Sequence, residues 1–259
     1  MIGTLVLVIP TRDGIVVAAD SRGAVRGQFY DGRKKLRVAR TIPPIVFAIT
    51  GAADFPNAIQ PGIPPEDWSY AFRSHETVSS CLLQDREFVL TPGRVNDIGD
   101  ALALSVGSFL TRSGKLEEFA DRDICRLVVC QSDAATGDSL YGSVAISMGS
   151  TGTIGLSGAR FERYLLDGYG CVERIGEGTY LNEVVLNGPG RQFLSNEALS
   201  LLTSPYWIKD IDSRAAVAIA TEVIRAAECT NKLSPIPSGS GIGGPAMCLV
   251  LQGSGVSQV

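Results

Sequence analysis

Three residues near the start of the chain have side chains that could take part in catalysis. Thr4 supplies a hydroxyl, Asp20 a carboxylate and Lys35 an ammonium group, which are the groups that nucleophilic and acid–base chemistry uses. The alternative interpretation is an ordinary ion pair between Asp20 and Lys35 beside a surface strand, with Thr4 a plain strand residue. The residue types alone leave both interpretations open.

The chain has a single histidine, His75, and this limits the catalytic mechanisms that it could use. Zinc motifs with two histidines are excluded, and any Ser-His-Asp or Cys-His mechanism would have to use this one residue. Because His75 lies in a polar stretch interrupted by prolines, we expect an enzyme of this sequence to use a different general base. We expect no metal and no cofactor.

The motifs around Thr4 resemble, in their order, those of the proteasome β-subunit family and its bacterial relatives, within the N-terminal-nucleophile hydrolases. They are Gly3-Thr4, Asp13-Gly14, Asp20-Ser21-Arg22, Lys34-Lys35, Ala48-Ile49-Thr50-Gly51-Ala52-Ala53-Asp54, Met148-Gly149-Ser150 and Gly243-Gly244-Pro245-Ala246. The resemblance implies an α+β fold, a four-layer αββα sandwich of two mainly antiparallel sheets between helices.

The resemblance also implies roles for six residues. Thr4 is the nucleophile after removal of Met1–Gly3, and its free α-amine, with a pKa of about 7.7–8.0, accepts the hydroxyl proton. Lys35 lies beside the amine and Asp20 holds Lys35. A backbone N–H of Thr50 or Gly51 forms the oxyanion hole, and Ser150 helps move the proton on the amine.

The sequence departs from the family pattern at several places. Thr50 stands where family members commonly have glycine, and Lys35 is one residue nearer to Asp20 than the family spacing. The family's aspartate ahead of the last strand is not reproduced, and the candidates to replace it are Glu228, Thr230 and Ser238. Because Ile2 hinders removal of Met1 alone, Thr4 becomes N-terminal only if the chain is cut after Gly3.

The function implied by the resemblance is that of a threonine-type peptidase acting on peptides or unfolded proteins. Such subunits self-associate into rings around a chamber, and an ATPase unfoldase is a possible partner. Two alternatives stay open: a non-catalytic structural subunit of the same fold, and a hydrolase of a small amide.

Composition limits the other classes of function. The chain has 259 residues and a net charge of −4, which argues against a nucleic-acid-binding protein. No apolar run approaches the roughly 18 residues of a membrane helix, so we expect no membrane partner and a cytoplasmic location. Seven cations against one acid lie between Arg22 and Arg40, and we expect this segment to face an acidic subunit or an acidic peptide.

We expect one domain, 1–259, with an insertion or long ordered loop at about 54–93. The expected strands are Thr4–Ile9, Ile15–Ala19, Lys34–Ala39, Ile45–Thr50, Ile124–Gln131, Ser139–Ser147 and Ala246–Leu251. The expected helices span about Ile98–Leu110, Thr153–Leu166 and Ser213–Cys229. Six scattered cysteines without CxxC spacing indicate buried, reduced thiols rather than a disulfide framework.

Overall fold

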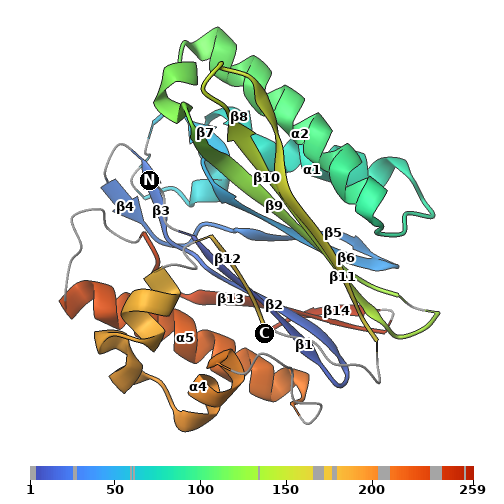
Figure 1. The fold of residues 1–259 in the computed structure, drawn as a ribbon, viewed down its shortest axis with the longest axis vertical. Coiled ribbons are helices and arrows are strands. Elements are labelled where there is room, and N and C mark those ends of the chain that lie inside the picture. Colours follow the sequence, from blue (N-terminus) through green and yellow to red (C-terminus); the bar gives the residue numbers. More distant parts are fainter. Residues whose placement is uncertain are drawn as a thin grey trace.

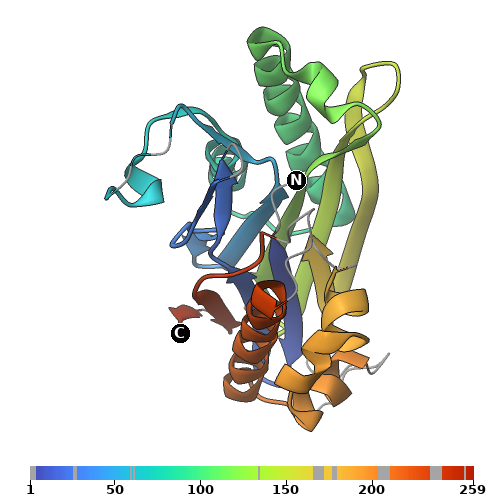
Figure 2. The same ribbon diagram turned by 90° about the vertical axis from the view of Figure 1, so that its left-hand side faces the viewer.

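The computed structural model describes residues 4–25, 28–58, 60, 62–133, 135–165, 172–176, 180–203, 211–233, 241–253 and 255–259. Two five-stranded sheets lie face to face, and helices cover the outer face of each (Figure 1). The view turned by 90° shows the same order of layers (Figure 2). The αββα sandwich expected from the resemblance is therefore confirmed.

The first sheet has the strand order β12-β1-β2-β13-β14 and the second has the order β11-β10-β9-β6-β5. All neighbouring strands are antiparallel. The first sheet consists of β1 (Leu5–Thr11), β2 (Gly14–Asp20), β12 (Glu173–Gly176), β13 (Ala246–Gln252) and β14 (Gly255–Gln258). The second consists of β5 (Leu36–Thr41), β6 (Pro44–Gly51), β9 (Arg122–Ser132), β10 (Ser139–Met148) and β11 (Ile154–Tyr164). Two small ribbons pair β3 (Gly23–Val25) with β4 (Gln28–Tyr30), and β7 (Asp54–Pro56) with β8 (Tyr70–Arg73).

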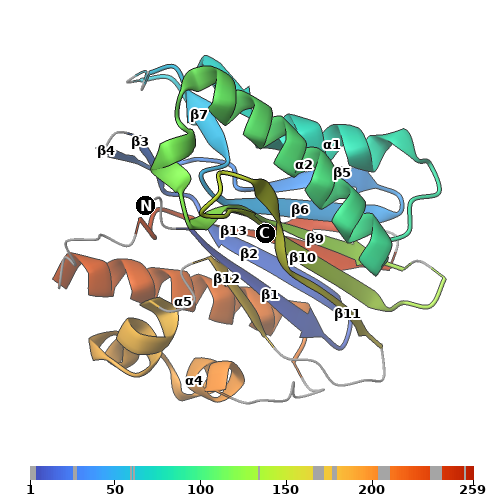
Figure 3. The ribbon, with the colours of Figure 1, turned by 45° about the horizontal axis from the view of Figure 1, so that its top comes forward.

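Helices α1 and α2 cover the second sheet, whereas α4 and α5 cover the first (Figure 3). Their bounds are α1 Ser74–Gln84, α2 Pro92–Ser113, α4 Asn196–Thr203 and α5 Ser213–Leu233. Short helical turns span Pro65–Asp67, Leu116–Phe119, Leu181–Leu186 and Pro189–Phe193. The ends of α2 follow from its sequence: the Thr91 hydroxyl accepts from the N–H of Arg94, and Gly114 ends the helix with φ of 65°.

The apolar core forms three layers, which explains the nearly continuous apolar runs of the central strands. In β1, Leu5, Leu7 and Ile9 pack against the helices, while Val6 and Val8 face the other sheet. Every one of these side chains is fully buried. Period-two alternation puts successive residues on opposite faces, so a strand covered on both sides needs apolar residues throughout.

The expected helix at about 153–166 is wrong, because Ile154–Tyr164 forms strand β11. This strand pairs with β10 at one edge of its sheet, and most of its side chains are half-buried or exposed. An edge strand with a wet face lacks the apolar alternation that identifies inner strands. Gly155 and Gly158 also lower the helix propensity of this segment.

The stretch expected to be an insertion or long loop contains the ribbon β7–β8 and helix α1. Phe72 of β8 stacks on Phe109 of α2, with ring centroids 5.0 Å apart. Val78 and Leu82 of α1 are fully buried. The segment is therefore part of the layer that covers the second sheet.

Five cysteines lie in the described residues, and all are free thiols; Cys171 lies outside them. Cys125 faces the helices and Cys130 faces the other sheet. Burial raises the pKa of Cys125 to about 12, so this thiol stays protonated and unreactive.

Candidate active site

Thr4 directly precedes β1 and is almost fully buried, with 4% of its surface exposed. Its carbonyl lies against Gly176 at the end of β12, where an added Cβ would come within 1.9 Å of the Thr4 oxygen. Gly176 also has φ of 89°, so glycine is required there for both reasons. The pairing of β1 with β12 thereby fixes the backbone next to the Thr4 hydroxyl.

The Asp20 carboxylate joins the Thr4 backbone to Lys35. Asp20 ends β2 and is completely buried. Its Oδ1 accepts from the N–H of Leu5 at 2.9 Å and from Nζ of Lys35 at 2.8 Å. Because both donors bind one oxygen, the Lys35 ammonium lies within a few ångströms of the Thr4–Leu5 peptide.

Burial changes the acid–base properties of this pair. It lowers the pKa of Lys35 to about 8, although the Asp20 carboxylate opposes the shift. Burial also raises the pKa of Asp20, against the effect of Lys35 and the backbone donors. An ammonium group that titrates near neutral pH beside a threonine is suited to proton transfer and electrostatic stabilisation.

A second group of contacts supports Asp20 from the C-terminal part of the chain. The N–H of Gly243 donates to Oδ2 of Asp20 at 3.2 Å, and the Gly243 carbonyl accepts from the N–H of Arg22 at 2.9 Å. The Arg22 guanidinium binds Asp31 at 2.7 Å and Glu228 at 3.0 Å.

The three candidates to replace the missing aspartate differ in where the structure places them. Glu228 contacts the group around Asp20 through Arg22. The Thr230 hydroxyl instead donates to the Ala226 carbonyl within α5. Ser238 lies outside the described residues.

Thr50 and Gly51 lie at the end of β6, close to Thr4. A Cβ on Gly176 would lie 3.6 Å from Cβ of Thr50, so the Thr50 side chain is a neighbour of the Gly176–Thr4 contact. Gly51 has φ of 82°, and a Cβ there would come within 2.7 Å of the Ile124 carbonyl. The glycine allows the chain to turn sharply beside the candidate nucleophile.

Ser150 is exposed in the turn between β10 and β11. The turn is closed by the N–H of Gly149, which donates to the Thr153 carbonyl at 3.0 Å. Within the described residues, Ser150 forms no hydrogen bond with Thr4, Asp20 or Lys35. Its proposed role in proton movement stays a prediction.

A buried ionic cluster that the sequence does not predict lies near Lys35. Arg33 binds Asp54 at 2.8 Å, and Asp54 accepts from the N–H of Ser74 at 3.0 Å. Nδ1 of His75 lies 3.6 Å from the Asp54 carboxylate. Burial would raise the pKa of Asp54, but His75 and Arg33 lower it to about 2. The sequence signals were the cation-rich segment Arg22–Arg40 and the separate Ala53-Asp54 motif.

The described residues contain neither a candidate metal site nor a helix that could span a membrane. No group of three or more His, Cys, Asp or Glu side chains there could hold a metal ion. None of the described helices combines the length and the apolar character needed to cross a bilayer.

No protein-family model and no curated protein matches the chain. Solved structures do. The helical assembly of the Anbu complex from Pseudomonas aeruginosa matches with a TM-score of 0.53 at 16% identity, covering 98% of this chain and 86% of that one. The Anbu (Gly-1) mutant from Hyphomicrobium sp. strain MC1 matches with a TM-score of 0.52 at 13% identity, covering 99% and 85%. The chain has the fold of Anbu.

At this level of identity, the likeness to Anbu concerns the fold. It agrees with the sandwich of two antiparallel sheets between helices described above. Functional roles for individual residues rest on the geometry of this chain.

Proposed function

We propose that this chain is an N-terminal threonine hydrolase that cleaves peptide bonds, with Thr4 as nucleophile after removal of Met1–Gly3. The observation that carries the proposal is the Asp20 carboxylate, which binds the Lys35 ammonium and the N–H of Leu5 through one oxygen. Burying two charges costs free energy, and an ordinary structural ion pair could form at the surface without that cost. The complete burial of Asp20 and Lys35 beside Thr4 therefore favours a catalytic role for the pair.

In the proposed reaction, the free amine of Thr4 accepts the proton of its own hydroxyl, and Oγ1 attacks the carbonyl carbon of the scissile bond. A backbone N–H of Thr50 or Gly51 donates to the oxyanion. The protonated α-amine then gives its proton to the nitrogen of the leaving group, and the scissile C–N bond breaks. The amine product leaves, and water hydrolyses the acyl ester that remains on Oγ1 of Thr4. The Lys35 ammonium lowers the pKa of the α-amine and so keeps it in the basic form.

We further propose that the chain self-associates. The P. aeruginosa Anbu structure is a helical assembly, and a common fold makes an assembly of many copies the reasonable expectation here. Ring closure and an unfoldase partner stay predictions.

The decisive experiment combines intact mass with activity. We expect the active protein to lack Met1–Gly3, and Thr4→Ala to lose peptidase activity by about 10³-fold or more, as removal of a nucleophile does. Thr4→Ser, which keeps a hydroxyl and an amine, is the matched control and should retain measurable activity.

An epoxyketone, which reacts with both the hydroxyl and the amine of an N-terminal threonine, should label the wild type at Thr4 and leave Thr4→Ala unlabelled. An active preparation whose mass still includes Met1 would contradict the mechanism. A chain that is neither cut nor labelled would instead be the structural subunit.

A further inference from the structure

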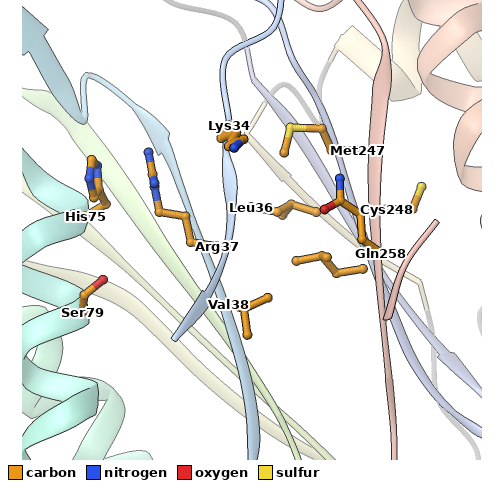
Figure 4. Close-up of a pocket in the computed structure, with 10 residues that line it drawn as sticks. Lys34, Leu36, Arg37, Val38, His75, Ser79, Met247, Cys248 and Gln258 are labelled. Carbon is orange, nitrogen blue, oxygen red and sulfur yellow. The ribbon is translucent and has the colours of Figure 1, made fainter. Parts of the chain in front are cut away.

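A cavity of 310 Å³ lies at one edge of the sandwich, where α1, β5, β13 and β14 line it. This volume is in the range of about 300–1,000 Å³ that ligand pockets occupy. One wall is β5, and the opposite wall consists of β13 and β14. In Figure 4, Arg37 extends from β5 toward His75 of α1, while Met247 and Gln258 approach from the other wall.

The lining of this cavity carries two cations, Lys34 and Arg37, beside the His75 imidazole. No carboxylate side chain lines it among the described residues. Lys34 has an ion pair with Glu66 at 3.6 Å but stays 57% exposed. Arg37 is partly buried and forms no ion pair within the described part of the chain. Burial lowers the pKa of Arg37, although the Asp54 and Glu66 carboxylates oppose the shift, so the guanidinium has lost hydration and these carboxylates do not fully compensate for the loss.

The cavity also offers backbone groups. Strand β5 pairs only with β6, and β14 pairs only with β13 in the described structure, so both are sheet edges. Edge strands carry unpaired N–H and C=O groups that can bind an extended chain. No aromatic ring other than the His75 imidazole lines the cavity, which disfavours a nucleic acid because stacking on nucleobases needs such rings.

We propose that this cavity binds an extended acidic peptide segment, whose backbone pairs with the edge of β5 and whose carboxylates contact Arg37 and Lys34. The charge of the lining matches such a ligand, and the two free strand edges favour a polypeptide over a small anion. Lys35 is directed to Asp20, whereas Lys34 lines the cavity, so the peptide site is separate from the Thr4 cluster. The proposal goes beyond the hydrolase function and does not depend on it.

The test uses the full chain with Thr4→Ala, so that no turnover interferes. The probe is a fluorescently labelled heptapeptide in which glutamate alternates with valine, and its partner carries glutamine at each glutamate. We expect saturable binding of the glutamate peptide in fluorescence anisotropy, and binding of the glutamine peptide weaker by about tenfold or more. Added salt should weaken the first and have little effect on the second.

Two substitutions locate the binding site. Arg37→Gln should weaken binding by about tenfold, whereas Arg37→Lys should keep part of it. Arg225→Gln removes an equal charge from an exposed position on α5 and is the matched control, with no expected effect. Bound peptide should also slow amide hydrogen exchange in Leu36–Thr41.

Equal binding of the two peptides would overturn the proposal, as would Arg37→Gln binding within about twofold of its parent. A third outcome has two parts: the Thr4→Ala chain binds neither peptide, and Arg37→Gln loses self-association. That outcome would assign the cavity to a second copy of this chain instead of a peptide. None of these outcomes bears on the labelling and mass of Thr4, so failure here and failure of the hydrolase function are distinguishable.

Discussion

At the scale of single residues, Asp20 determines what the candidate site can do. Its carboxylate accepts from the backbone at Leu5 and Gly243 and from the Lys35 ammonium. These donors oppose the effect of complete burial, which nevertheless raises the pKa of the Asp20 carboxyl above its ordinary value. Asp20 is therefore a positioning residue, since it fixes the ammonium beside Thr4 without contacting the reacting bond.

The pKa of Lys35 predicts the pH dependence of activity. Peptidase activity should rise as the Thr4 amine loses its proton and fall as Lys35 loses its own near about 8, because the ammonium is the form that stabilises developing negative charge. Lys35→Arg keeps its charge throughout this range, so its alkaline limb should move to higher pH even if the maximal rate falls. The measurement is kcat/KM between pH 5 and 10.

The control for this prediction is Lys115→Arg, a conservative change away from the Thr4 cluster, which should keep the wild-type profile. An alkaline limb that stays at the same pH in Lys35→Arg would show that another group titrates there.

At the scale of elements, Asp54 ties several parts of the second sheet's cover together. It follows β6, binds Arg33 and accepts from the first N–H of α1 at Ser74. The Arg33 side chain is only 10% exposed, so its charge depends on this carboxylate. The Asp54 carboxylate thereby links the start of α1 to the segment that leads to Lys35.

Asp54→Asn should lower the free energy of unfolding at pH 7 by about 3–5 kcal/mol, because it leaves a buried guanidinium without its carboxylate. The native pKa of about 2 lies below the ordinary 3.8, so the stabilisation is present above pH 3.8 and disappears as pH falls toward 2. Denaturant titrations from pH 7 to pH 2 should show wild type and variant converging at low pH. Asp100→Asn, at an exposed position of α2, is the control, and a constant difference across the pH range would contradict the assignment.

The sequence predicts the inner strands well because their burial on both faces leaves a strong signal. β1, β2 and β6 read as continuous apolar runs, and the structure buries nearly all their residues. The sequence of β11 gives an ambiguous pattern because one face of this strand is exposed to solvent. Helix α1 was missed because only Ser74, Val78 and Leu82 are buried among its eleven residues, which gives little helical periodicity.

Contacts in the candidate active site also differ in how well the sequence predicts them. The family resemblance implies the pairing of Asp20 with Lys35, and the structure shows this ion pair. The donor from Gly243 lies 223 residues away from Asp20, and only the pairing of β2 with β13 brings them together. Contacts that depend on sheet topology carry no local signal in the sequence.

At the scale of the whole molecule, the two open edges of the sandwich differ. At the β11–β12 edge, Arg160 of the second sheet binds Glu173 of the first at 2.7 Å, and the Tyr164 hydroxyl lies 3.4 Å from the same carboxylate. At the β5–β14 edge, the cavity lined by Lys34 and Arg37 lies open instead. One edge is closed by ionic contacts and the other is available to a ligand.

This asymmetry predicts that Glu173 contributes to the stability of the whole sandwich. Its side chain is 8% exposed, whereas that of Arg160 is 47% exposed, so Arg160 can be rehydrated when its partner is lost. Glu173→Gln should therefore cost about 1–3 kcal/mol, less than Asp54→Asn, and lower the Tm by about 2–4 °C per kcal/mol. Glu162→Gln removes the other, more exposed partner of Arg160 and should cost less than about 1 kcal/mol. The measurement is calorimetry on the wild type and the two variants. A single transition whose Tm falls only in Glu173→Gln would show that the ionic contacts at the β11–β12 edge hold the sheets together. Equal Tm values in all three proteins would mean that apolar packing alone joins the sheets.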